Sequence, residues 1–139
     1  MLDCLNKIKV KSGETYLVKG GILHAIGSGC LILEIQEPTD YTIRVEKTTP
    51  SGFKIDDMMC HQGLGFRKMF ECFEFERFTE NEIREKCQLK EVEAILKNGV
   101  IKKEIVTYSR TPCFNLTKLN ISGSSEIDIK NTYNNEIKL

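Results

Sequence analysis

Residues 13–28 read GETYLVKGGILHAIGS, and this stretch decides the fold that we expect. Gly13 and Gly21 permit tight turns because glycine readily adopts backbone conformations that other residues avoid. Short β-prone runs lie between these glycines and the next pair, Gly27 and Gly29. Short strands separated by glycine turns are typical of a β-barrel or a β-sandwich.

The residues on either side extend this β pattern. Residues 7–11 alternate polar and apolar side chains, and residues 42–46 alternate again. Residues 30–35, CLILEI, form a nearly continuous apolar run, which is typical of a strand buried on both faces. The sequence therefore predicts strands in these three segments and near 16–18 and 22–26.

The middle of the chain predicts helices. Phe66, Met69, Phe70 and Phe73 recur at helical spacing, so we expect a helix within residues 56–73, with glycines interrupting its first part. An aromatic stripe of this kind favours a helix packed on a sheet over the wall of a ligand site.

A second helix is predicted to begin after Thr79. Thr79 and Glu82 have the spacing of a capping box, in which each side chain binds a backbone N–H of the other, and the helix would run to about Cys87. The β pattern then returns at residues 100–108, 113–121 and 126–130.

These patterns predict one mainly β domain over residues 1–139. It would consist of a β region at 1–52, a helical segment at 53–90 and a second β region at 91–139. No internal repeat suggests further domains.

The composition excludes several classes of protein. The chain has 20 Lys and Arg against 20 Asp and Glu, so its net charge is zero and a nucleic-acid partner is not expected. No apolar run is long enough to span a bilayer, and no signal peptide follows Met1. The six cysteines form no CxxC pair and are interpreted as reduced thiols. We therefore expect a cytoplasmic protein without a membrane partner.

The opening stretch resembles the second cupin motif. In that motif a glycine is followed by five residues, then Pro-x-Gly, then two residues and a histidine. Gly13, Gly21 and His24 fall at these spacings, whereas Lys19 replaces the proline and Ser28 an asparagine. The resemblance implies a cupin-like (jelly-roll) β-barrel or partial barrel with His24 pointing into its mouth.

Three longer runs are similar to the type I phosphomannose isomerase family. HAIG at 24–27, ILEIQ at 32–36 and DYTIRV at 40–45 match the series "GTxHAIG … ILEIQ … SDxTYRV" of that family. The similarity extends from about Leu5 to Val45 and places the chain near the end of the family's catalytic cupin.

This resemblance implies metal-assisted interconversion of mannose 6-phosphate and fructose 6-phosphate, usually with zinc. His24 matches the family's metal-binding histidine, and Arg44 its active-site arginine, a permanent charge suited to a developing oxyanion. Glu34 matches an acidic residue of the same cavity that could carry the proton. Each also has a plainer interpretation: a satisfied barrel histidine for His24, and strand ion pairs for Arg44 with Glu46 or Glu34.

The sequence lacks the family's other metal ligands. It contains no Gln-x-His or His-x-His, and its other histidine, His61, lies in the helical segment and is interpreted as a surface or packing residue. Zinc usually takes roughly three or four protein ligands, so a lone chain is not expected to be a competent zinc enzyme. The chain would be an isomerase-like protein that is incomplete on its own. The alternatives are a catalytically silent cupin that binds a sugar phosphate or a protein partner, and a different small metal-dependent cupin enzyme that combines His24 with other carboxylates.

A homodimer is also expected. A cupin without its early strands leaves sheet edges and apolar faces open, and both favour association through β segments that pair across chains or cover the exposed face.

Overall fold

The computed structural model describes residues 5–39, 41–95 and 100–123 of the chain, and the backbone alone at 93–95. The chain divides into two compact units, Met1–Leu89 and Lys90–Leu139.

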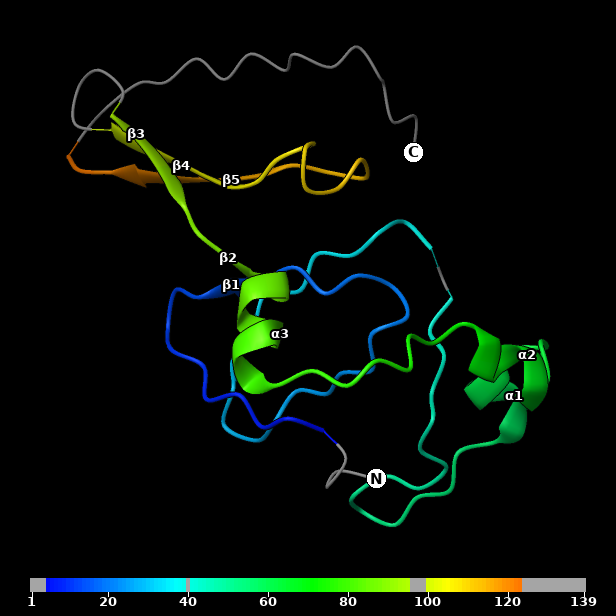
Figure 1. Cartoon of the computed structure of the whole chain (residues 1–139). Coiled ribbons are helices and arrows are strands. Elements are labelled where there is room, and N and C mark those ends of the chain that lie inside the picture. The colour runs from blue at the N-terminus through cyan, green and yellow to red at the C-terminus, as the bar shows by residue number, and fades with distance from the viewer. Residues whose placement is uncertain (1–4, 40, 96–99, 124–139) are drawn as a thin grey trace. The chain divides into compact units, whose positions relative to one another are not determined.

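The first unit is held together by a short ribbon beside a helix (Figure 1). Strand β1 (Thr15–Tyr16) pairs antiparallel with β2 (Gln88–Leu89), which directly follows helix α3 (Glu80–Cys87). Leu17 N–H extends the ribbon by donating to the Cys87 carbonyl at 2.8 Å. The start of the chain is thereby fixed to the end of α3.

Helix α3 has the predicted capping box. Thr79 Oγ1 accepts a hydrogen bond from the Glu82 N–H at 3.3 Å, and the Glu82 carboxylate accepts from the Thr79 N–H at 2.7 Å. Two backbone donors that the first turn would leave unpaired are thus satisfied. The helix ends at Cys87, as predicted.

The predicted helix within 56–73 is two short helices, α1 (Asp57–His61) and α2 (Phe66–Glu71). The interruption falls at Gly63 and Gly65, which have φ angles of 85° and 75°. These left-handed conformations suit glycine and are incompatible with a continuing α-helix. Met69 of α2 and Cys60 of α1 are buried.

The second unit contains the larger sheet. Strands β3 (Val92–Ile95), β4 (Val100–Val106) and β5 (Leu116–Ile121) pair antiparallel in that order. The β4–β5 register shifts between Glu104 and Val106, as in a β-bulge. Val100 and Val106, at the two ends of β4, are buried.

The predicted strands of the second β region are largely confirmed. Strand β4 lies within the predicted 100–108 and β5 within 113–121. The prediction for 126–130 lies outside the described residues. Strands β2 and β3 were not among the predicted strands.

Most strand predictions for the first β region are wrong. Of the segments expected to be strands before residue 47, only the neighbourhood of Tyr16 contributes to one, namely β1. Residues 7–11, 22–26, 30–35 and 42–46 lie outside any strand. A strand requires a hydrogen-bonded neighbour, and within the described chain no neighbour pairs with these segments. The run at 30–35, expected to be buried, is exposed throughout.

The predicted fold class, a mainly β partial barrel with a helical segment in the middle of the chain, is nevertheless confirmed. The described strands form two antiparallel sheets, helices occupy the middle of the chain, and no closed barrel forms among these residues, so the fold is a partial one. The single-domain organisation with boundaries at 52 and 90 stays a prediction. Within the described residues, no helix is both long and apolar enough to cross a bilayer.

Candidate functional site

His24 lies on the surface a few residues beyond a tight turn. Gly21 makes this turn with a φ of 88°, and a Cβ at this position would lie 3.1 Å from the Cys72 carbonyl oxygen. The Gly21 carbonyl accepts from the Glu74 N–H at 2.9 Å, so the motif glycine is fixed against residues that follow α2. His24 Nδ1 lies 2.9 Å from the Ile22 carbonyl oxygen, which leaves the exposed imidazole its Nε2 for a further partner.

Glu34 lies within the exposed run CLILEIQ at 30–36. Its carboxylate has no hydrogen bond or ion pair with any described residue. The group is therefore available to a ligand or to another polypeptide.

Arg44 is fixed beside helix α1. Its N–H donates to the Cys60 carbonyl at 3.0 Å, and Nη1 donates to the carbonyls of Met59 and Thr42 at 3.2 and 3.3 Å. Gln62, in the left-handed conformation with a φ of 48°, donates from Nε2 to the same Thr42 carbonyl at 2.9 Å. The sequence segment around Arg44 is thus held by α1 instead of by strand pairing.

A shallow pocket opens at Arg44. It has a volume of about 360 Å³ and is lined by Arg44, Met58, Met59 and Gln62. The strand ion pair considered for Arg44 is not formed with Glu34 or Glu46, and no described carboxylate pairs with its guanidinium. A cation without a counter-ion beside two methionines can accept an anionic ligand such as a phosphate or carboxylate.

No hydrogen bond or ion pair joins His24, Glu34 and Arg44 to one another among the described residues. In the same part of the chain, no group of at least three His, Cys, Asp or Glu side chains could hold a metal ion. His61 packs edge to face against Phe66 at 5.0 Å between ring centroids, which confirms its interpretation as a packing residue.

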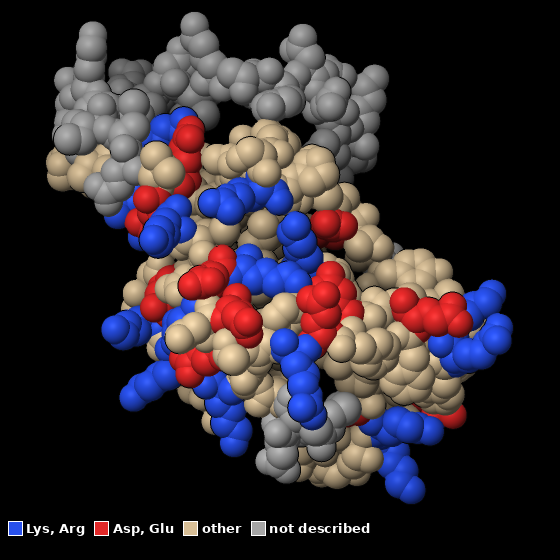
Figure 2. Space-filling view, in the orientation of Figure 1, with Lys and Arg blue, Asp and Glu red and all other residues tan. Residues whose placement is uncertain are grey.

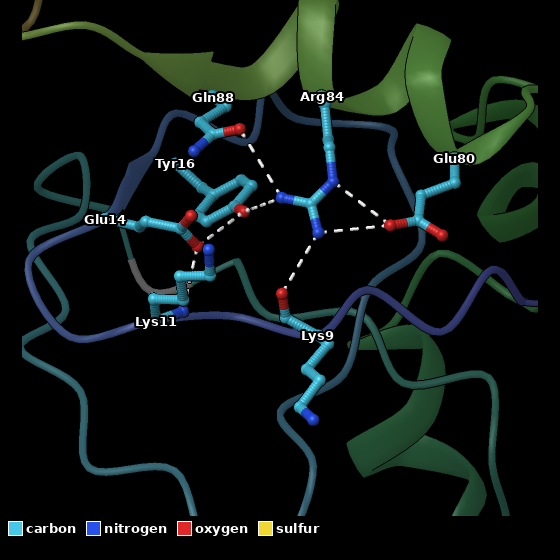
Figure 3. Close-up of polar contacts among 7 residues, drawn as sticks. All are labelled: Lys9, Lys11, Glu14, Tyr16, Glu80, Arg84 and Gln88. Atoms are coloured by element: carbon cyan, nitrogen blue, oxygen red, sulfur yellow. Dashed lines mark hydrogen bonds and ion pairs between the residues drawn. The ribbon is translucent and has the colours of Figure 1, made fainter.

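A polar cluster of the first unit surrounds Arg84 (Figure 3). Nη1 donates to the Tyr16 hydroxyl at 2.8 Å, Nη2 donates to the Lys9 carbonyl at 3.0 Å, and Nε donates to Glu80 at 3.1 Å. The Tyr16 hydroxyl in turn donates to Glu14 at 3.1 Å. The guanidinium therefore joins α3 to the start of the chain, and its donors are used by the protein itself.

Hydrogen bonds and partial burial shift the pKa values of two members of this cluster, Glu14 and Tyr16. The backbone N–H of Lys11 and the Tyr16 hydroxyl, both hydrogen-bonded to Glu14, lower the pKa of this carboxyl. Partial burial and the hydrogen bond to Glu14 raise the pKa of Tyr16, which stays neutral at physiological pH. Neither shift indicates a site poised for acid–base chemistry.

This cluster was not predicted from the sequence. The i, i+4 spacing of Glu80 and Arg84 could have indicated their ion pair. The contact of Arg84 with Tyr16 joins residues far apart in the sequence, so no local sequence pattern indicates it.

Figure 2 shows positive and negative side chains interspersed over the face drawn, without a patch of one sign.

Comparison with known proteins gives one match over nearly the whole chain and shorter matches with higher identity. A probable mannose-6-phosphate isomerase of Bacillus subtilis, GmuF, is 30% identical over 129 residues, which are 93% of this chain and 36% of that protein. A mannose-6-phosphate isomerase of Streptococcus mutans is 51% identical over 41 residues, or 30% of this chain and 13% of the relative. A putative mannose-6-phosphate isomerase of B. subtilis, YvyI, is 49% identical over 41 residues, again 13% of its length.

No family model matches the chain, and no solved structure matches it. The chain spans about a third of GmuF and a smaller part of the other two relatives. It is therefore similar over nearly its whole length to one part of a probable mannose-6-phosphate isomerase, and more strongly similar to the other two relatives over 41 residues.

Proposed function

We propose that this chain is a member of the mannose-6-phosphate isomerase family, with a cupin-like fold that is incomplete without additional polypeptide. The observation that carries the proposal is the match to GmuF over 93% of the chain. The identity of about half within 41 residues of two further relatives supports the same family. The substrate class is a sugar phosphate with an aldose and a ketose form.

In this proposal His24, Glu34 and Arg44 form one sugar-phosphate site when the fold is complete. Glu34 would remove the proton from C2 of the aldose to give a cis-enediolate and return it to C1, while the hydroxyl proton of O2 moves to O1, which yields the ketose. Arg44 would stabilise the negative charge that develops on the oxygen during this transfer. The absence of ion-pair partners for Glu34 and Arg44 among the described residues supports their availability.

Zinc does not fit the described residues. His24 offers one imidazole nitrogen, and no metal-binding group forms around it within 5–39, 41–95 and 100–123. A single neutral ligand binds zinc weakly, so the remaining ligands would have to come from the additional polypeptide. We therefore assign no step of the reaction to zinc in this chain.

A catalytically silent, sugar-phosphate-binding module is the second candidate function. The observation that favours it is the open pocket at Arg44, whose guanidinium has no carboxylate partner in the described structure. This module would bind the phosphorylated sugar without converting it.

We further propose a cytoplasmic location, in keeping with free thiols at all five described cysteines.

Metal analysis of the purified chain together with a mannose 6-phosphate isomerase assay in added zinc distinguishes these functions. The incomplete isomerase predicts substoichiometric zinc and no turnover by the chain alone. It also predicts turnover once the remaining part of GmuF, the B. subtilis relative, is co-expressed. Stoichiometric zinc with turnover by the chain alone would show that it is complete. Sugar-phosphate binding that never leads to turnover, even with the added part, would establish the silent module.

A further inference from the structure

Residues 30–36, CLILEIQ, have the composition of a buried strand but the environment of a surface loop. Leu31, Ile32, Leu33 and Ile35 are 101%, 48%, 86% and 43% exposed. No backbone N–H or C=O of this segment is hydrogen-bonded to another described residue. Water satisfies the free backbone, but exposing four large aliphatic side chains in so short a segment is unfavourable.

We propose that residues 30–36 pair antiparallel with the same residues of a second copy of this chain, as the centre of a homodimer. The pairing is centred on Leu33, which faces Leu33 of the second copy. Leu31 then faces Ile35, and both lie on the same side of the ribbon as Leu33 because side chains alternate along a strand. On the other side Ile32 faces Glu34.

The distribution of charge selects this register. Glu34 is the one charged residue of the segment. Centring the pair on Glu34 would place two carboxylates directly opposite, about 5 Å apart, which is destabilising. Centring it on Ile32 would leave Ile35 opposite Gly29 and lose an apolar pair. The Leu33 register alone pairs all the aliphatic residues of one side and separates the two carboxylates.

The same pattern favours a second copy over an unrelated partner. Leu31 and Ile35 lie symmetrically about Leu33, so this side of the segment is complementary to itself under a two-fold rotation. Such a contact uses the same edge of both copies and closes at two subunits. The chain has a net charge of zero, so two copies do not repel each other at long range.

Light scattering during size exclusion, combined with amide hydrogen exchange of the full chain, is the first test. The proposal predicts a dimer at micromolar concentration and protection of alternate amides in residues 30–36 that decreases on dilution. A monomer with unprotected amides would overturn it and point to a different polypeptide as the partner. A dimer that leaves these amides unprotected would overturn it as well.

A charge pair at position 33 tests the register directly. Leu33→Lys and Leu33→Glu each place like charges opposite each other, so each variant alone is expected to dimerise at least about tenfold more weakly. An equimolar mixture of the two should regain dimerisation, because Lys then faces Glu. Ile26→Lys, at a residue that is 55% exposed outside the segment, is the matched control and should dimerise as the unmodified chain does.

The charge pair has two outcomes that contradict the proposal. Dimerisation of either single variant at the unmodified strength would show that residue 33 lies outside the interface. Failure of the mixture to regain it, with both variants folded by circular dichroism, would exclude the register centred on Leu33. Because Leu33 is 86% exposed, neither substitution should disturb the folded monomer.

Discussion

The Nη1 atom of Arg84 donates a 2.8 Å hydrogen bond to the hydroxyl of Tyr16, and this bond joins α3 to β1 across 68 residues of sequence. The same guanidinium also binds Glu80 and the Lys9 carbonyl (Figure 3). One side chain therefore connects the start of the chain, the ribbon β1–β2 and helix α3.

Arg84→Ala should lower the melting temperature of the first unit by several degrees. The substitution removes the donors for the Tyr16 hydroxyl and the Lys9 carbonyl and the partner of Glu80. Thermal unfolding followed by circular dichroism measures the change. Arg77→Ala is the control, because Arg77 is exposed and makes no hydrogen bond or ion pair with a described residue. Equal effects of the two substitutions would contradict the role of the cluster.

Thr79→Ala should destabilise the chain by about 1 kcal/mol through loss of the N-cap of α3. The alanine leaves the Glu82 N–H without its acceptor. Thr79→Ser keeps the hydroxyl and should retain most of the stability. Urea unfolding of both variants measures the difference, and similar losses for serine and alanine would show that the capping hydrogen bond contributes little.

Stability should decrease in acid partly because of Glu82. Hydrogen bonds from the Thr79 backbone N–H and hydroxyl lower the pKa of Glu82 below its ordinary value of 4.5. A carboxyl whose folded pKa is depressed stabilises the fold above the unfolded pKa, and this stabilisation is lost as the pH falls through the folded pKa. The melting temperature should therefore fall below about pH 5, and less steeply in Glu82→Gln.

The matched control for the acid experiment is Glu85→Gln on the same helix, where Glu85 is exposed and makes no hydrogen bond or ion pair with a described residue. In Glu85→Gln, the melting temperature should fall with decreasing pH as steeply as in the unmodified chain. If the melting temperatures of Glu82→Gln and Glu85→Gln fell equally steeply with decreasing pH, the capping carboxylate would not be a source of the acid sensitivity.

Arg44→Gln should weaken binding of mannose 6-phosphate by about tenfold or more, because a charge-assisted hydrogen bond to phosphate contributes about 1.5–3 kcal/mol. Titration calorimetry measures the affinity. Arg67→Gln is the control, since Arg67 is exposed on α2 and makes no hydrogen bond or ion pair with a described residue. Unchanged affinity in a folded Arg44→Gln variant would exclude the Arg44 pocket as the binding site.

Local signals in the sequence predicted part of this structure well. Thr79 and Glu82 form the expected capping box because the interaction involves residues three apart and needs no tertiary context. The two glycines at 63 and 65 mark the break between α1 and α2 for the same reason. Strand β4 was predicted within the β-prone segment 100–108, and its pairing with two neighbours stabilises it.

Features that depend on distant partners were not predictable. The run at 30–35 reads as a buried strand because its composition suits one, yet no described segment pairs with it. Strand propensity expresses fit to neighbouring strands, so it cannot reveal whether these neighbours are present. The contact of Arg84 with Tyr16 likewise depends on the ribbon β1–β2, which was not expected.

The candidate site was predicted from resemblance, and the structure adds the surroundings of its residues. Arg44 borders a pocket and lacks a carboxylate partner among the described residues, which sequence alone did not indicate. His24 and Glu34 are exposed. The convergence of the three residues on one ligand remains a prediction.

The central claim is that His24, Glu34 and Arg44 form one sugar-phosphate site, and a nuclear magnetic resonance titration of the labelled chain with mannose 6-phosphate tests it most directly. The account predicts that the backbone amides of these three residues shift together and saturate with a single dissociation constant. Shifts confined to other residues, or none at millimolar ligand, would contradict it.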